Sequence, residues 1–422
     1  MSLFRATQES VKTSCFSNGL SHNGEVSYRS KMLVLLLVIP AGCSTAPKQP
    51  PPDVTLMPAP ELVATPPKPV VVIKPAPAPT PAPVPPPVVT NHFITPTETW
   101  VPLEHWCQVN GFAAPRRTAT EQGWVYSFTT TNGTFVIRVG SQLATWRGVE
   151  YHLGFAPQMI NNHPFVHALD IRKNFIPLLE NTIHTKTNRV VVIDPGHGGT
   201  DTGTKNVFNS HSEKEFTLDW ARRLHSLLAT NGWTVLLTRT NDVEMKLPAR
   251  VAFAEQHQAD LFVSLHFNSA FPDQAEAGLE TYCLTPKGMP STLTRGFKDD
   301  WSLAFPNNNF DAENVQYAGR VHRALLKVNG HADRGVRRAR FLGVLQGQNR
   351  PAVLIEGGYL SNPTEARHIA DPAYREKLAE AVAQALTEDS GGGLIPARPV
   401  PAAPSVTNRP APPVVQPEEQ TE

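Results

Sequence analysis

Residues 189–199 read RVVVIDPGHGG, an apolar run that leads directly into a histidine set among glycines. A continuous apolar run of this length is typical of a strand that is buried on both faces, as strands are in a parallel sheet. His197 therefore follows the end of a predicted strand. In open α/β sheets, ligands bind beyond the carboxyl ends of the strands, so this histidine is a candidate for chemistry.

Strand and helix patterns alternate from this run to about residue 387. Apolar residues recur at helical spacing from Phe216 to Leu228, where Gly232 ends the helix, and again from Ala249 to Ala254. Further strands are predicted at residues 234–238, 261–265, 279–284, 341–346 and 351–355. The alternation predicts an α/β fold: a mostly parallel twisted sheet with helices on both faces.

Other reactive side chains are predicted at the same edge of this sheet. Two later strands run directly into His266 and Glu356, and Glu213 and Glu215 stand at the start of the first helix. Two histidines and a carboxylate that converge form a zinc site with one position open for water, and a further carboxylate can take that water's proton. Each residue alone has a structural explanation, but together they indicate a catalytic metal site.

The motifs from Val191 to Asn362 read, in order, VVIDPGHGGTDTG, EK, LTR, ARVAFAEQHQADLFVSLHFN, GLETY, DRGVRRARFLGVL and PAVLIEGGYLSN. This series resembles the type 3 family of zinc-dependent N-acetylmuramoyl-L-alanine amidases. Members of that family cleave the amide bond between N-acetylmuramic acid and L-alanine in peptidoglycan. The resemblance extends from about residue 189 to residue 385.

By position, the resemblance implies that one Zn²⁺ ion is bound by three side chains and that a fourth is the catalytic carboxylate. The implied zinc ligands are His197, Glu213 and His266, and the implied catalytic residue is Glu356. Glu215 is the competing ligand, but the family places its ligand immediately before the lysine, which favours Glu213.

Asn268 and Arg334 are candidates for binding the oxyanion or the stem peptide. Asn268 could equally cap a strand, and Arg334 could be a solvated charge. The segment 286–313 is longer than the simplest family members need. Some members carry a helix here that blocks the zinc site until an activating partner removes it. The Pro and Asn content of this segment favours instead a loop that shapes the substrate groove. The sequence does not identify an activating partner.

Two other functions remain open. A catalytically silent module would use the same fold only to bind peptidoglycan, but the residues expected at all four site positions are present. A zinc peptidase would cut within the stem peptide, but the chain has no His-Glu-x-x-His sequence of the common metalloproteases. Lys and Arg total 38 against 37 Asp and Glu, which gives no indication of a nucleic-acid partner.

Residues 1–43 are predicted to be a leader. The apolar run at 33–39 is too short to span a bilayer but suits a secretory signal. The following PAGC resembles the lipobox of bacterial lipoproteins, although Pro40 stands where Leu, Val or Ile is usual. Lipidation of Cys43 would anchor the protein to a membrane, and plain secretion is the alternative. Both predict an exported protein of the periplasm or cell envelope.

The rest of the chain divides by composition. The 41 prolines concentrate near the two ends, so residues 44–93 are predicted to be a linker and residues 389–422 a disordered tail. Between them we predict a small α+β accessory domain at 94–184 and the catalytic domain at 187–388.

The accessory domain is predicted to open with a strand and a helix and to contain a hairpin that turns at Asn132-Gly133. This pattern is similar to a small domain at the N-terminus of copper amine oxidases, and we expect it to be noncatalytic, serving wall binding or spacing. The wide separation of the four cysteines favours buried thiols at Cys107 and Cys283 over a disulfide.

Overall fold

The computed structural model describes residues 93–180, 183, 189–208, 211–330 and 332–387. The predicted leader, the predicted linker as far as residue 92 and the predicted tail lie outside these ranges. Within them, none of the helices is both long and apolar enough to cross a membrane.

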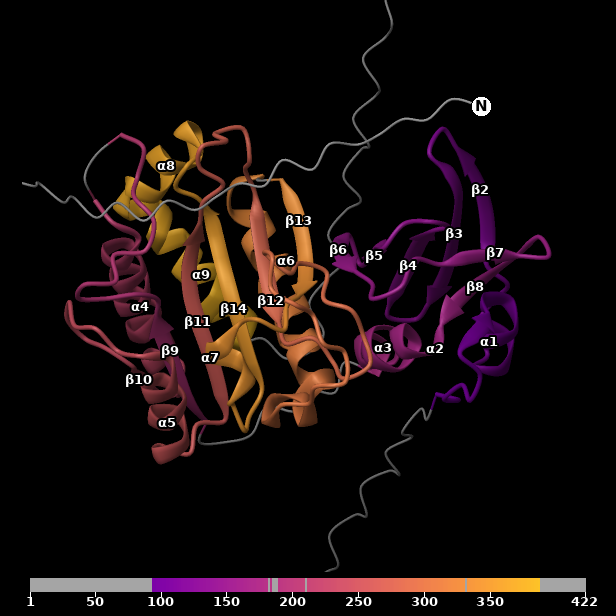
Figure 1. Ribbon diagram of the computed structural model, residues 1–422, viewed down its shortest axis with the longest axis horizontal. Helices are drawn as coiled ribbons and strands as arrows, with labels where there is room; N and C mark the ends of the chain where they lie inside the picture. The colour runs from indigo at the N-terminus through magenta and orange to yellow at the C-terminus, as the bar shows by residue number, and fades with distance from the viewer. Residues whose placement is uncertain (1–92, 181–182, 184–188, 209–210, 331, 388–422) are drawn as a thin grey trace, which may run out of the picture. The chain divides into compact units, whose positions relative to one another are not determined.

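Six strands of the catalytic region form one sheet with the order β10-β9-β11-β14-β12-β13 (Figure 1). The first four run parallel, β12 is antiparallel to β14, and β13 is parallel to β12. The sheet is therefore mostly parallel, with its parallel part centred on β9 and β11. The strands are β9 (Val190–Pro195), β10 (Thr234–Leu237), β11 (Leu261–Asn268), β12 (Leu279–Cys283), β13 (Asp333–Arg338) and β14 (Ala352–Tyr359).

Helices cover both faces of this sheet, as the sequence predicts. Alternate strand residues point to opposite faces, so Val191 packs into one apolar cluster and Val192 into another. The first cluster includes side chains of α4 (Glu213–Thr230), α6 (Asp311–Asn329) and α9 (Pro372–Thr387). The second includes side chains of α5 (Leu247–Gln256) and α7 (Gly343–Gln346). A further helix, α8 (Pro363–Ala370), follows β14.

The predicted strand at residues 341–346 is wrong. The chain forms the short helix α7 there, with Val344 and Leu345 buried. A short apolar run fits one helical turn as well as it fits a strand, and periodicity cannot separate the two. The strand is instead β13, whose sequence DRGVRR is dominated by charged residues and contains a single apolar side chain, that of Val336.

The accessory region contains the predicted opening strand and helix and the predicted hairpin. Its core is aromatic: the ring centroids of Phe135 and Phe175 lie 4.7 Å apart, and those of Trp106 and Phe128 lie 5.7 Å apart. The elements are β1 (Trp100–Pro102), α1 (Leu103–Val109), β2 (Arg116–Thr120), β3 (Gly123–Thr130), β4 (Gly133–Arg138), β5 (Leu143–Trp146), β6 (Val149–His152), β7 (Gln158–Ile160), β8 (His163–His167), α2 (Ala168–Asp170), the π-helix η1 (Ile171–Phe175) and α3 (Ile176–Glu180).

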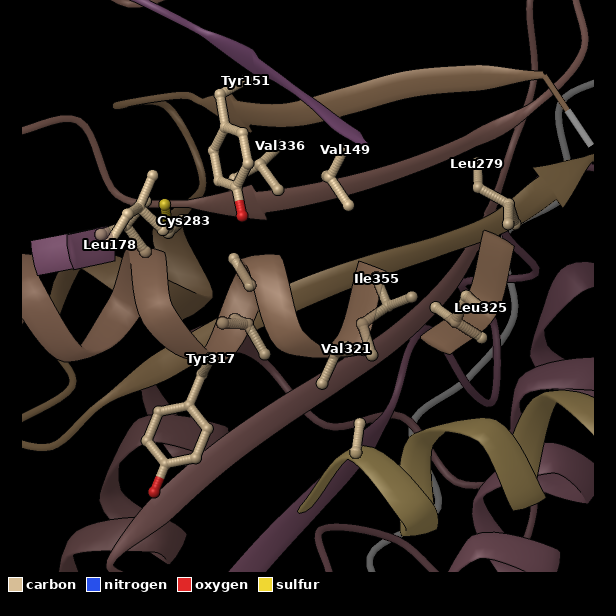
Figure 2. Close-up of a cluster of buried hydrophobic side chains, with 14 of the residues drawn as sticks. Val149, Tyr151, Leu178, Leu279, Cys283, Tyr317, Val321, Leu325, Val336 and Ile355 are labelled. Carbon is tan, nitrogen blue, oxygen red and sulfur yellow. The ribbon is translucent and has the colours of Figure 1, made fainter. Parts of the chain in front are cut away.

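The accessory and catalytic regions share a sheet and a core. Tyr151 of β6 pairs with Val336 of β13, which extends the sheet to eleven strands. Figure 2 shows side chains of β6 and α3 in the same buried cluster as those of α6, β12 and β13. Arg338 of β13 crosses the junction and donates hydrogen bonds to the Lys173 carbonyl at 2.7 Å and to Asn174 Oδ1 at 2.8 Å. The two regions are therefore packed as one body.

Both cysteines in the described ranges are buried free thiols. This confirms the expectation for Cys107 and Cys283.

Candidate metal centre and active site

Three side chains that are far apart in sequence offer ligand atoms at one point of the sheet edge. His197 follows β9, Glu213 is the first residue of α4, and His266 lies in β11. Glu213 Oε1 is 3.1 Å from His197 Nε2 and 2.9 Å from His266 Nδ1. All three ligand atoms lie within 4.8 Å of one another.

The backbone brings the two histidines together because β9 and β11 are neighbouring parallel strands. Their carboxyl ends meet at the same edge, where the Gly196 amide donates to the Leu265 carbonyl at 3.0 Å. A Cβ atom at Gly196 would collide with the His266 ring, so only glycine allows this approach. His197 itself adopts a φ of 62°, a left-handed conformation that turns the chain back over the site.

Glu213 is held as an ionised carboxylate. Its side chain is buried, and it also accepts hydrogen bonds from the Phe267 amide at 3.1 Å and the Thr204 amide at 3.0 Å. Burial alone would raise the pKa of Glu213, but the hydrogen bonds and positive charge of the two histidines outweigh it and lower the pKa. The buried carboxylate thus supplies negative charge where the three ligand atoms meet.

Glu215, the competing ligand, does not join this group. Its Oε1 accepts a hydrogen bond from the Ser212 amide at 3.0 Å, which completes a capping box at the start of α4. Its Oε2 lies 2.5 Å from His211 Nδ1, and both side chains are exposed. The structure therefore places Glu213, and not Glu215, beside His197 and His266.

Glu356 lies next to this triad, on the strand beside β11. It pairs with His266 across the parallel ladder and with Glu280 of β12 on its other side. Burial raises the pKa of Glu356 well above its ordinary range, and the charge of Glu213 raises it further, while the charge of Arg295 opposes both. Its buried Oε2 has no hydrogen-bond partner among the described residues. This carboxylate is therefore available to exchange a proton with a bound molecule.

Asn268 and Arg334 meet at another carboxylate, that of Glu280, rather than at the triad. Asn268 Nδ2 donates to Glu280 Oε2 at 2.9 Å, and Arg334 Nε donates to Glu280 Oε1 at 2.8 Å. Arg337 and Tyr282 also donate to Glu280, at 2.9 Å and 2.6 Å. These donors are thus already used within the protein.

Glu280 was not identified from the sequence. It is a glutamate within the otherwise uncharged strand LETYC, and it is only 1% exposed. A charged residue at a predicted buried strand position was the signal that could have found it. Its hydrogen bonds with Asn268, Arg334 and Arg337 hold β12 in place beside β14, the strand that carries Glu356.

Asp201, also missed, lies behind the first histidine. Its Oδ1 is 2.8 Å from His197 Nδ1, on the side of the ring away from Glu213. Burial works to lower the pKa of His197, but Glu213 and Asp201 outweigh it and raise the pKa to about 9. A carboxylate behind a ligand histidine fixes its orientation and strengthens it as a ligand.

We expect Asp201→Asn to weaken zinc binding by about 10- to 100-fold, as for other groups that orient a ligand histidine. The carboxamide can still hydrogen-bond to His197, but it lacks the charge that favours a bound cation. Competition with a chromophoric chelator would measure the zinc affinity, and thermal unfolding of the metal-free variant would show that the fold is intact. Wild-type zinc affinity in a folded Asp201→Asn protein would contradict this role.

The donor set fits a divalent metal ion, and zinc in particular. Two imidazole nitrogens and one carboxylate oxygen form the protein part of many catalytic zinc sites, which leave a fourth position open. All three ligand atoms lie within 4.8 Å of one another, close enough to share one ion. Glu213 and Asp201 place negative charge on both sides of the His197 ring, which favours a cation at this point.

A cavity of about 310 Å³ adjoins the triad, and both His197 and His266 line it. Other lining residues are Glu244 and Met245 of the loop before α5, and Leu247, the first residue of that helix. The candidate metal centre is therefore open to molecules larger than water.

A family model described as N-acetylmuramoyl-L-alanine amidase matches residues 191–388. The amidase AmiA of Escherichia coli (strain K12) is 30% identical over 217 residues, which cover 46% of this chain and 74% of AmiA. AmiC of Escherichia coli O6:H1 is 30% identical over 214 residues, but the match spans only 51% of its length. The catalytic domain of CwlV from Bacillus (Paenibacillus) polymyxa var. colistinus, a solved structure, is 32% identical, with 47% of this chain and 96% of that chain covered and a TM-score of 0.39. The chain thus belongs to the N-acetylmuramoyl-L-alanine amidase family.

Proposed function

We propose that this protein is a zinc-dependent hydrolase that cleaves the amide bond between N-acetylmuramic acid and L-alanine of peptidoglycan. The observation that carries the proposal is the convergence of His197, Glu213 and His266 beside the buried, unpartnered carboxylate of Glu356. Family membership supports the choice of substrate, because the matched relatives are named for this reaction.

The three ligands would hold one zinc ion at the end of β9 and β11. When bound, the ion would supply Lewis acidity, which lowers the pKa of a water molecule and polarises the scissile carbonyl. Glu213 would balance the charge of the site, and Asp201 would hold the His197 ring in place. The cavity beside the two histidines would admit the substrate.

Glu356 would act as the proton carrier. It would accept a proton as water attacks the lactyl carbonyl of muramic acid and forms the new C–O bond. It would return that proton to the L-alanine nitrogen as the C–N bond breaks. The products are a lactyl carboxylic acid on the sugar and a free amine on the peptide, so atoms and protons balance.

The proposed substrate lies outside the cytoplasmic membrane. Export through the leader at 1–43, with or without an anchor at Cys43, would place the enzyme in the cell envelope. We propose that the accessory region is noncatalytic: the triad and Glu356 all come from the catalytic region, and accessory residues enter the shared core instead.

The test is digestion of purified peptidoglycan by the zinc-loaded full chain, followed by mass spectrometry of the soluble products. We expect free stem peptides that begin with L-alanine, and no release after treatment with a chelator. New amines within the stem would instead identify a peptidase. Binding to peptidoglycan without any release, although zinc is bound, would identify a silent binding module.

A further inference from the structure

The segment between β12 and the 3₁₀ helix η2 (Pro306–Phe310) carries an arginine to the edge of the active site. Arg295 has a φ of 47° and Gly296 a φ of 80°, so the chain reverses sharply there. Nη2 of Arg295 donates a hydrogen bond to Asn268 Oδ1 at 3.2 Å. Asn268 follows the metal ligand His266 by two residues on β11, so the guanidinium lies beside the catalytic machinery.

The loop that carries Arg295 is fixed at its base. The Ser291 amide donates to Asp299 Oδ2 at 2.6 Å, and Arg340 forms an ion pair with the same carboxylate. Beyond the arginine, the ring of Phe297 stacks on that of Phe341, with centroids 5.4 Å apart. A loop that is anchored in this way presents its tip in a defined position, which lowers the entropic cost of using it to bind a ligand.

The charge of Arg295 acts on the site but is not neutralised within the described ranges. Arg334 and Arg337 both pair with Glu280, and Arg340 pairs with Asp299. Arg295 has no such ion pair among the described residues, and its Nε and Nη1 donate no hydrogen bond there. The side chain is exposed, and its guanidinium carbon lies 5.7 Å from the centroid of the Phe341 ring.

We propose that Arg295 binds a carboxylate of the stem peptide, on the L-alanine side of the scissile bond, and that it determines specificity for that carboxylate. This inference rests on the proposed function. A guanidinium presents paired N–H donors that match the two oxygens of a carboxylate. The sugar side of the bond offers no such group, because its hydroxyl and acetamido groups are neutral and the lactyl carboxyl is held in the amide. The peptide side carries free carboxylates.

The competing role for Arg295 is to tune Glu356. Its positive charge opposes the rise in the pKa of Glu356 that burial and Glu213 produce. Tuning of this kind would change the rate for every substrate by the same factor. A specificity role predicts instead that the effect of the substitution depends on the charge of the substrate, which separates the two roles.

The test measures kcat/KM for two muramoyl peptides that differ only in the residue after L-alanine, which carries either a free carboxylate or the matching carboxamide. We expect the wild-type, zinc-loaded full chain to prefer the carboxylate by about 10- to 100-fold, the range for a hydrogen bond between charged groups. Arg295→Gln should reduce this preference to near unity, mainly by slowing cleavage of the carboxylate substrate. Lys298→Gln, which removes one exposed positive charge from the same loop, should keep it.

Equal rates for the two substrates with wild-type enzyme would overturn the inference without reference to any variant. So would an Arg295→Gln protein that slows both substrates by the same factor, which would assign the arginine to tuning. Failure of wild-type enzyme to cleave either substrate would refute the proposed amidase function itself, and the inference with it. Cleavage of both substrates with no preference leaves the amidase function standing and removes only the role of Arg295.

Discussion

Glu356→Gln should lower kcat for amide cleavage by about 10²- to 10⁴-fold, the usual contribution of a positioned acid–base group. The carboxamide keeps the shape of the side chain but cannot accept the proton of the attacking water. The substitution should not lower stability in the metal-free protein. Because the folded-state pKa of Glu356 is raised, ionising this buried carboxylate destabilises the fold as pH rises, and glutamine has no charge to bury.

Three measurements on Glu356→Gln test this expectation together: release of stem peptides, zinc affinity and thermal unfolding. Zinc affinity should stay near the wild-type value, because Glu356 is not one of the three converging ligands. Glu244→Gln is the control, since Glu244 lines the cavity but, unlike the buried Glu356, is exposed and pairs with Lys246. Wild-type kcat in zinc-loaded Glu356→Gln would show that another group carries the proton.

The sequence was sufficient to predict the strands that build the site. β9, β11 and β14 are apolar runs buried on both faces, and each leads into one reactive residue. Their continuous apolar runs are typical of strands buried on both faces, and the parallel order made their carboxyl ends meet. The strand β13 escaped prediction because its arginines are satisfied by distant partners such as Glu280. Those partners become visible only when the sheet is assembled.

The choice between Glu213 and Glu215 shows a second limit of prediction from the sequence. Both residues lie in the first turn of α4, and the helix dipole favours a carboxylate at either position. The capping geometry separates them: Glu215 turns back to the Ser212 amide, while Glu213 turns inward. From the residues alone the two remained alternatives, and only the resemblance to a family favoured one.

The shared core of the accessory and catalytic regions also could not be predicted from the sequence. Composition and pattern predicted a boundary near residue 184, where one set of elements gives way to another. The pairing of Tyr151 with Val336 joins residues far apart in the chain, and short-range patterns carry no signal for such a contact. Arg338 spans the junction and is buried, but nothing in its sequence context distinguishes it from an arginine on the surface.

Glu213→Gln should weaken zinc binding by more than the ~10- to 100-fold expected for Asp201→Asn, because it alters a ligand rather than a group behind one. Loss of the carboxylate also removes the negative charge that Glu213 places against both histidines. Zinc bound to the native state stabilises it by an amount that grows with affinity. The wild-type melting temperature should therefore rise when zinc is added, and that of Glu213→Gln should rise much less.

Glu215→Gln is the matched control, with the same substitution two residues along the same helical turn. Glutamine also completes a capping box, so α4 should remain capped. This variant should keep the wild-type zinc affinity and the full rise in melting temperature, because Glu215 faces solvent beside His211. The reverse pattern, with zinc lost from Glu215→Gln and kept by Glu213→Gln, would transfer the ligand role to Glu215. Since the two side chains share a helix turn and a charge, a difference between the variants would report only which carboxylate points at the metal.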